Sequence, residues 1–120
     1  CVPMSKMAKY KRGYNQSELL STKIAKILSI PNFTDCLQTV GKKKKQHLLS
    51  LEERVKNVRD VFKCNHKING KTVLLVDDIK TTGATLNECA KQLLIAGANR
   101  VYCVTALTTF KKEKNHKNKE

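Results

Sequence analysis

An α/β fold with a mostly parallel central sheet flanked by helices is predicted by three observations on the sequence. Val73 to Val76 is a run of four apolar residues, which is typical of a short strand buried on both faces. A helical pattern and a second strand pattern follow this run and end at Leu107. From Thr72 to Leu107 the chain has about 35 residues, the length of one strand–helix–strand crossover between parallel strands.

The first predicted helix spans Asn15 to Leu28. Asn15 is a favourable N-cap residue, and Glu18 stands three residues later, as a capping box requires. Pro31 prevents the helix from extending further. The spacing of apolar residues predicts that one face is buried, and this face is formed by Leu20, Ile24, Ile27 and Leu28.

Weaker patterns connect this helix to the parallel unit. Phe33 to Val40 predicts a strand, and Gly41 with the four lysines that follow it predicts a basic loop. Ser50 to Glu53 has the pattern of a second capping box, which predicts a short helix through about Val58.

The parallel unit itself begins after a turn. Asn69-Gly70 is typical of a tight turn and leads directly into a strand over Thr72 to Asp77. The next helix is predicted over Thr85 to Ala96, and Gly97 is its C-terminal stop. Val101 to Leu107 is rich in β-branched and apolar residues and predicts the second strand. The helix residues expected to face inward are Leu86, Cys89, Ala90, Leu93 and Leu94.

Length and charge limit the organisation and the classes of partner. With 120 residues the chain is expected to form one domain over residues 1–110, followed by a disordered basic tail over residues 111–120 that has no apolar residue. The net charge of +14 comes from 24 Lys and Arg against 10 Asp and Glu, and it favours anionic partners such as nucleotides, diphosphates or nucleic acid.

Cysteine usage and hydropathy indicate the compartment. The five cysteines are odd in number and form no Cys-x-x-Cys pair, so we expect reduced thiols. No apolar run approaches the roughly 20 residues of a membrane span, and no signal peptide is visible. A cytoplasmic location is therefore expected. Cys1-Val2-Pro3-Met4 has the character of the end of a strand, which predicts an N-terminally truncated domain whose first strand is incomplete.

The candidate functional site follows the first strand of the parallel unit. Asp77 and Asp78 are expected where this strand leaves the sheet, at the edge where ligands of parallel sheets bind. The next segment, Thr81 to Thr85, has hydroxyl groups, a glycine and a helix N-terminus, all of which favour a phosphate. Carboxylates beside an anion site suit a ribose phosphate. The simpler alternative is that an aspartate only caps the helix.

Val73 to Thr85 resembles the signature that binds 5-phosphoribosyl 1-diphosphate (PRPP) in type I phosphoribosyltransferases. Further segments resemble the ComF (competence protein F, GntX-like) branch of that superfamily. These segments are Val2-Pro3-Met4, the run from Lys11 to Leu20, and the string Gln46, Leu49, Arg54, Asn57 and Phe62. The resemblance extends from residue 2 to about residue 107 and implies the type I phosphoribosyltransferase fold.

The resemblance also implies roles for particular residues. Asp77 and Asp78 would bind the ribose hydroxyls as the catalytic pair and help to hold Mg²⁺ indirectly, with no direct protein ligand to the metal. The 5′-phosphate would be bound by Thr81, Thr82, Gly83, Ala84 and Thr85. Pyrophosphate and a closing flap would involve Ser5, Lys6, Arg12, Lys44, Lys45 and Gln46, although Arg12 and the Lys42 to Lys45 run are equally explained as ordinary solvated surface.

The sequence departs from the family pattern in two places, and the first of them, at Thr81, leaves the acceptor open. Many purine-specific relatives have an acid at the position of Thr81, and the ComF family usually has an N-terminal zinc module with paired cysteines, which this sequence lacks. Two functions remain. One is Mg²⁺-dependent transfer of ribose 5-phosphate from PRPP to an unknown acceptor, with release of pyrophosphate. The other is a non-catalytic competence or DNA-uptake factor that binds single-stranded DNA or a partner protein of the competence machinery. The oligomeric state is left open.

Overall fold

The structure is a computed structural model, which describes residues 1–4, 6–40, 61–80 and 82–109. The predicted basic loop after Gly41, the helix near Ser50 and the tail over residues 111–120 lie outside the described residues. The described elements are α1 (Lys6–Arg12), α2 (Gln16–Leu28), β1 (Leu37–Thr39), β2 (Phe62–Cys64), β3 (Thr72–Lys80), α4 (Ala84–Ile95) and β4 (Arg100–Thr108).

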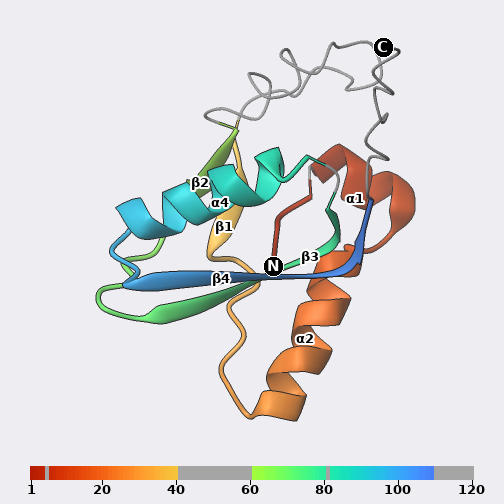
Figure 1. The fold of residues 1–120 in the computed structure, drawn as a ribbon. Coiled ribbons are helices and arrows are strands. Elements are labelled where there is room, and N and C mark those ends of the chain that lie inside the picture. Colours follow the sequence, from red (N-terminus) through yellow and green to blue (C-terminus); the bar gives the residue numbers. More distant parts are fainter. Residues whose placement is uncertain (5, 41–60, 81, 110–120) are drawn as a thin grey trace, which may run out of the picture.

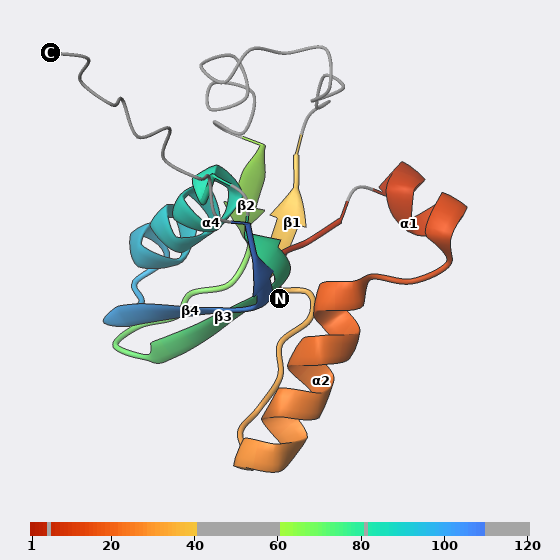
Figure 2. The ribbon, with the colours of Figure 1, turned by 45° about the vertical axis from the view of Figure 1, so that its right-hand side comes forward.

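A parallel strand pair forms the centre of the described fold (Figure 1). β3 and β4 run parallel, in a register that pairs Thr72 with Arg100 and continues to Lys80 and Thr108. α4 connects the two strands and packs against both, whereas α2 packs against β3. The two helices lie on opposite sides of the strands, as the rotated view in Figure 2 also shows. The predicted strand–helix–strand crossover and the α/β class are therefore confirmed.

A second, smaller sheet is antiparallel. β1 and β2 have three residues each, and Leu37 pairs with Cys64. The strand predicted over Phe33 to Val40 was too long, because the chain turns at residues 34–36 and Phe33 is exposed. β2 packs against α4, so this sheet extends the core beyond the parallel pair.

The hydrophobic core lies between α4 and the strands. Its most deeply buried side chains are Phe62, Leu75, Leu93 and Cys89, each less than 2% exposed. Burial of such a side chain stabilises a fold by about 1.5–3 kcal/mol. On α4, Leu86, Cys89 and Leu93 are buried as predicted, but Leu94 is 50% exposed and the prediction for it was wrong.

The buried face of α2 differs from the predicted one. Ser17, Ser21 and Ala25 are buried, whereas Ile27 is 80% exposed and Leu28 is 55% exposed. These three small residues recur every four positions and therefore share one helix face, which allows the helix to approach β3 closely. Of the predicted apolar face, Leu20 and Ile24 are half-buried, so the prediction was wrong for Ile27 and Leu28.

The C-terminus of α4 is closed by Gly97, as predicted. Gly97 has φ +104°, its amide donates to the Leu94 carbonyl at 3.0 Å, and the Ala98 amide donates to the Leu93 carbonyl at 3.1 Å. This is the hydrogen-bond pattern of a Schellman motif. The predicted turn at Asn69-Gly70 is also confirmed, and its Gly70 amide donates to the Gly97 carbonyl at 2.9 Å. The turn before β3 is thus joined to the end of α4.

The N-terminal residues lie beside β3. The Val2 amide donates to the Val76 carbonyl at 2.8 Å, and Val2 is buried in the core. No helix among the described residues is both long enough and apolar enough to cross a membrane.

Candidate functional site

Asp77 and Asp78 lie within β3 and not at its end. The strand continues to Lys80, because β4 still pairs with it there: Ile79 is opposite Leu107, and the Thr109 amide donates to the Lys80 carbonyl at 3.0 Å. The prediction that the strand ends at the aspartates was therefore wrong. Both carboxylates are consequently carried on backbone that is held by a neighbouring strand.

The Asp77 carboxylate has fixed partners. Its Oδ1 accepts from Ser17 Oγ at 3.0 Å and from the Asp78 amide at 2.9 Å. Burial is the main cause that raises the pKa of Asp77 above its ordinary value, and a hydrogen bond with the Asp78 side chain raises it further. The bond from Ser17 acts in the opposite direction, because it stabilises the charged form. Asp78 Oδ1 accepts from the Ile79 amide at 2.9 Å.

The loop after β3 turns into α4 through Gly83. Gly83 has φ +81°, a left-handed conformation that L residues rarely adopt, and it is the N-cap of α4 without a side-chain cap of its own. A Cβ at this position would lie 3.2 Å from Lys80 Cε. The Ala84 amide donates to Thr82 Oγ1 at 3.2 Å. The remaining amides of the first helical turn have no partner within the helix, which makes this turn suitable for an anion.

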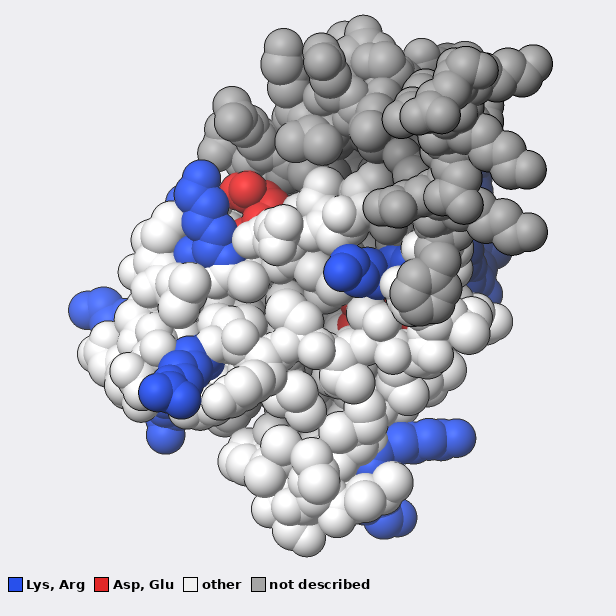
Figure 3. Space-filling view, viewed as in Figure 1, with Lys and Arg blue, Asp and Glu red and all other residues white. Residues whose placement is uncertain are grey.

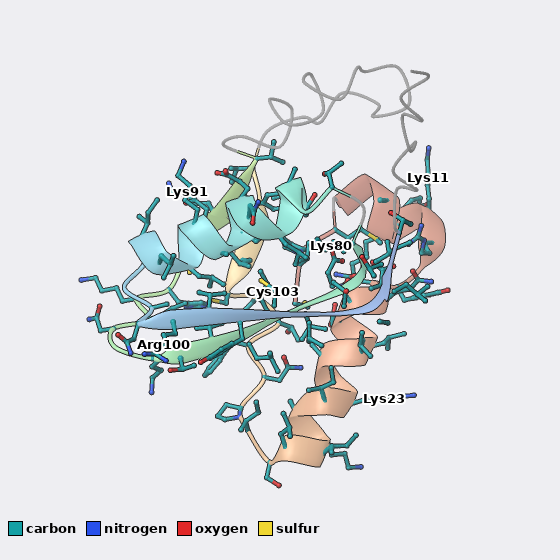
Figure 4. All side chains as sticks on the ribbon, in the orientation of Figure 1. Lys11, Lys23, Lys80, Lys91, Arg100 and Cys103 are labelled. Carbon is teal, nitrogen blue, oxygen red and sulfur yellow. The ribbon has the colours of Figure 1, made fainter. Side chains whose placement is uncertain are left out.

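Two adjacent hollows lie at this loop. The first is lined by Asp77 and by residues 79–80 and 82–86, and its volume is about 40 Å³. This is more than the roughly 10–15 Å³ that one water requires. The second hollow has a volume of about 240 Å³, and Lys80 and Cys103 line it together with Thr105 and the start of α4. Lys80 belongs to both hollows, and Figure 4 labels it with Cys103.

The structure brings only part of the predicted site together. Five of the predicted residues line the first hollow: Asp77, Thr82, Gly83, Ala84 and Thr85. Asp78 is the neighbour of Asp77 in the strand. Lys6 and Arg12 are the first and last residues of α1, and Arg12 is not among the described residues that line the two hollows. The predicted residues Ser5, Lys44, Lys45, Gln46 and Thr81 lie outside the described part of the chain.

Sequence reasoning missed Lys80 and Ser17. Lys80 follows the aspartates by two residues, and a cation between an acidic pair and a phosphate-type loop was a signal that could have identified it. Ser17 was noted only as part of the segment that resembles the ComF family. No sequence pattern places it beside Asp77, because 60 positions separate the two residues.

The donor set at the site is compatible with Mg²⁺. Within the described residues, no three or more His, Cys, Asp or Glu side chains are grouped so that they could enclose a metal ion. Mg²⁺ is usually bound by one or two carboxylates together with substrate phosphates, and not by a cage of protein ligands. The pair Asp77 and Asp78 fits an ion that is held mainly by the substrate.

Comparisons with known proteins show the family of this chain. The family model described as "Phosphoribosyl transferase domain" matches residues 15–120, so the chain belongs to the phosphoribosyl transferase domain family. Within this family it belongs to the ComF branch, since proteins of that branch are among its relatives.

Three relatives illustrate the similarity. The chain is 35% identical over 103 residues to "Competence protein F" of Haemophilus influenzae, covering 83% of this chain and 45% of that protein. It is 31% identical over 105 residues to "DNA utilization protein YhgH" of Escherichia coli K12, covering 86% of this chain and 46% of that protein. It is 33% identical over 96 residues to "Competence protein ComFC" of Bacillus subtilis, covering 80% of this chain and 38% of that protein. The chain thus spans less than half the length of these relatives. No solved structure matches it.

Proposed function

We propose that this domain binds PRPP together with Mg²⁺ and transfers its ribose 5-phosphate unit to an acceptor, with release of pyrophosphate. One observation carries the proposal: Asp77 and the amide-lined turn at residues 82–85 line the same hollow. A ribose 5-phosphate has hydroxyl groups and a terminal phosphate, and it needs carboxylate acceptors and anion-binding amides side by side. Membership of the phosphoribosyl transferase domain family supports this assignment.

The residues of the site have distinct tasks in this proposal. Asp77 and Asp78 accept hydrogen bonds from the ribose hydroxyls and stabilise the positive charge that develops on the sugar as pyrophosphate leaves. The turn at residues 82–85 holds the 5′-phosphate through backbone amides and the hydroxyl groups of Thr82 and Thr85. Lys80, which lines both hollows, lies close enough to contribute a positive charge to bound phosphate. Bound Mg²⁺ supplies charge compensation for the diphosphate.

Calorimetric titration with PRPP tests the proposal directly. Wild-type protein is expected to bind PRPP in the presence of Mg²⁺ and to lose most of this affinity when EDTA is added. The Asp77→Asn and Asp78→Asn variants should remain folded and bind PRPP at least tenfold more weakly, because each loses a charged acceptor. Absence of heat for wild-type protein, with no rise in Tm on adding PRPP and Mg²⁺, would contradict the proposal.

A non-catalytic role in binding DNA is the second candidate. It is favoured by the net charge of +14 and by the names of the relatives, which refer to competence and DNA utilization. However, the Lys and Arg side chains of the described residues are scattered over the face drawn in Figure 3. This candidate predicts single-stranded DNA binding that weakens steeply with salt and is unaffected by Asp77→Asn.

A further inference from the structure

A closed path of hydrogen bonds connects α2 to the acidic pair of β3. The Val2 amide donates to the carbonyl of Val76, the residue before Asp77, at 2.8 Å. Asn15 Nδ2 donates to the Val2 carbonyl at 3.2 Å, and Asn15 Oδ1 accepts from the Ser17 amide at 3.1 Å. Ser17 Oγ then lies 3.0 Å from Asp77 Oδ1, which brings the path back to β3.

The direction of the last bond follows from the partners of Ser17. The Asp78 amide can only donate, and it lies 3.2 Å from Ser17 Oγ, so this oxygen acts as an acceptor toward Asp78. The hydroxyl hydrogen is left for Asp77 Oδ1. The same Asp77 oxygen also accepts from the Asp78 amide at 2.9 Å. Two donors thus converge on one carboxylate oxygen and fix the orientation of the carboxylate.

Ser17 is well placed to hold this orientation because it is itself held. It is 4% exposed, in the first turn of α2, and its backbone is fixed by the Asn15 cap. A buried hydroxyl group needs a hydrogen-bond partner. The acceptor for the Ser17 hydroxyl is Asp77, the group that binds substrate in the proposed function.

We propose that Ser17 is a positioning residue of the phosphoribosyl site: its hydroxyl orients the Asp77 carboxylate toward the ribose hydroxyls of PRPP. This inference rests on the proposed function for its ligand, but the hydrogen bond on which it depends belongs to the protein alone. It gives the segment from Asn15 to Ser17 a task in the site, although that segment is about 60 residues away in the sequence.

The experiment compares two serines of the same helix. Ser21 is as buried as Ser17, at 5% exposed, but its hydroxyl donates to the Glu18 carbonyl and does not contact the acidic pair. Ser17→Ala is expected to weaken PRPP binding by about tenfold to a hundredfold, because a hydrogen bond to a charged group is lost. Ser21→Ala should bind as wild type does. Ser17→Thr keeps a hydroxyl group and should recover most of the affinity.

A second measurement keeps the inference separate from the proposed function. The carboxyl-carbon NMR signal of Asp77, followed during a pH titration without PRPP, reports its pKa in each variant. Ser17→Ala should raise this pKa above the wild-type value, because the donor that favours the charged form is gone, and Ser21→Ala should leave it unchanged.

The two measurements give distinguishable failures. If wild-type protein binds no PRPP, the proposed function fails, while a raised Asp77 pKa in Ser17→Ala would still support the orienting contact. If wild-type protein binds PRPP and Ser17→Ala binds it equally well, the positioning role is overturned. An Asp77 pKa that does not differ between wild type and Ser17→Ala overturns it as well. A Ser21→Ala variant that loses as much affinity as Ser17→Ala would show that the effect is general to the helix and would also overturn it.

Discussion

Replacement of Gly83 by alanine separates the backbone requirement of the loop from its role in binding. Gly83 has φ +81°, and an L residue in this conformation costs about 1–2 kcal/mol. The added methyl group would lie 3.2 Å from Lys80 Cε, the far end of a flexible side chain that can move aside. The cost of the left-handed backbone conformation is therefore the larger effect, and the free energy of unfolding should fall by about 1–2 kcal/mol. For a domain of this size the Tm should fall by roughly 4–8 °C.

Gly70→Ala is the matched control. Gly70 has φ +71°, and a methyl group there would meet no atom within 4 Å. Thermal unfolding should show the same loss for both variants, but only Gly83→Ala should lose PRPP affinity in calorimetry, by about tenfold, because its amide and its methyl group both lie at the first hollow. Equal PRPP binding by the two variants would refute the assignment of the loop as a phosphate site.

The remaining predictions concern three other places in the fold. The pKa of Asp77 is higher in the folded protein than in the unfolded chain. Between these two pKa values the folded protein binds more protons, so it loses stability as the pH rises through the folded-state pKa. The Tm of Asp77→Asn minus the Tm of wild type should therefore be more positive at pH 7 than at pH 4. The same Tm difference at both pH values would contradict this prediction. Ser29, the C-cap of α2, has φ 53°, a left-handed conformation that is unfavourable for serine. Ser29→Gly should therefore raise the free energy of unfolding by about 1 kcal/mol. An unchanged denaturation midpoint would show that this conformation costs no stability. The sulfurs of Cys36 and Cys64 lie 3.4 Å apart, so mild oxidation with a small disulfide should join them, with loss of two hydrogens by mass spectrometry and a stabilisation of about 3 kcal/mol. Peptide mapping that finds other cysteines paired first would refute this last prediction.

The fold could be predicted where local chemistry and periodicity agree. The run from Val73 to Val76, the helix ending at Gly97 and the following strand each have a clear pattern, and all three were found near the predicted positions. The end of β3 was misplaced because the acids at residues 77 and 78 look like loop residues. Only the pairing with β4 shows that the strand continues.

The candidate site was predictable in its contiguous part only. Asp77 and the residues from Thr82 to Thr85 lie within nine positions of one another, so one motif could identify them together. Ser17 reaches the same carboxylate through packing of α2 on β3, and that packing depends on small side chains that carry little hydrophobic signal. Contacts of this kind arise from tertiary structure and leave no trace in the periodicity of either segment.

Amide NMR with PRPP and Mg²⁺ locates the ligand as well as detecting it, and therefore tests whether the acidic pair and the loop after β3 form one binding site. We expect the largest chemical-shift changes on the amides of Thr82 to Thr85 and of Asp77 and Asp78. Changes that are absent there, or that fall only on exposed lysines elsewhere in the chain, would contradict it.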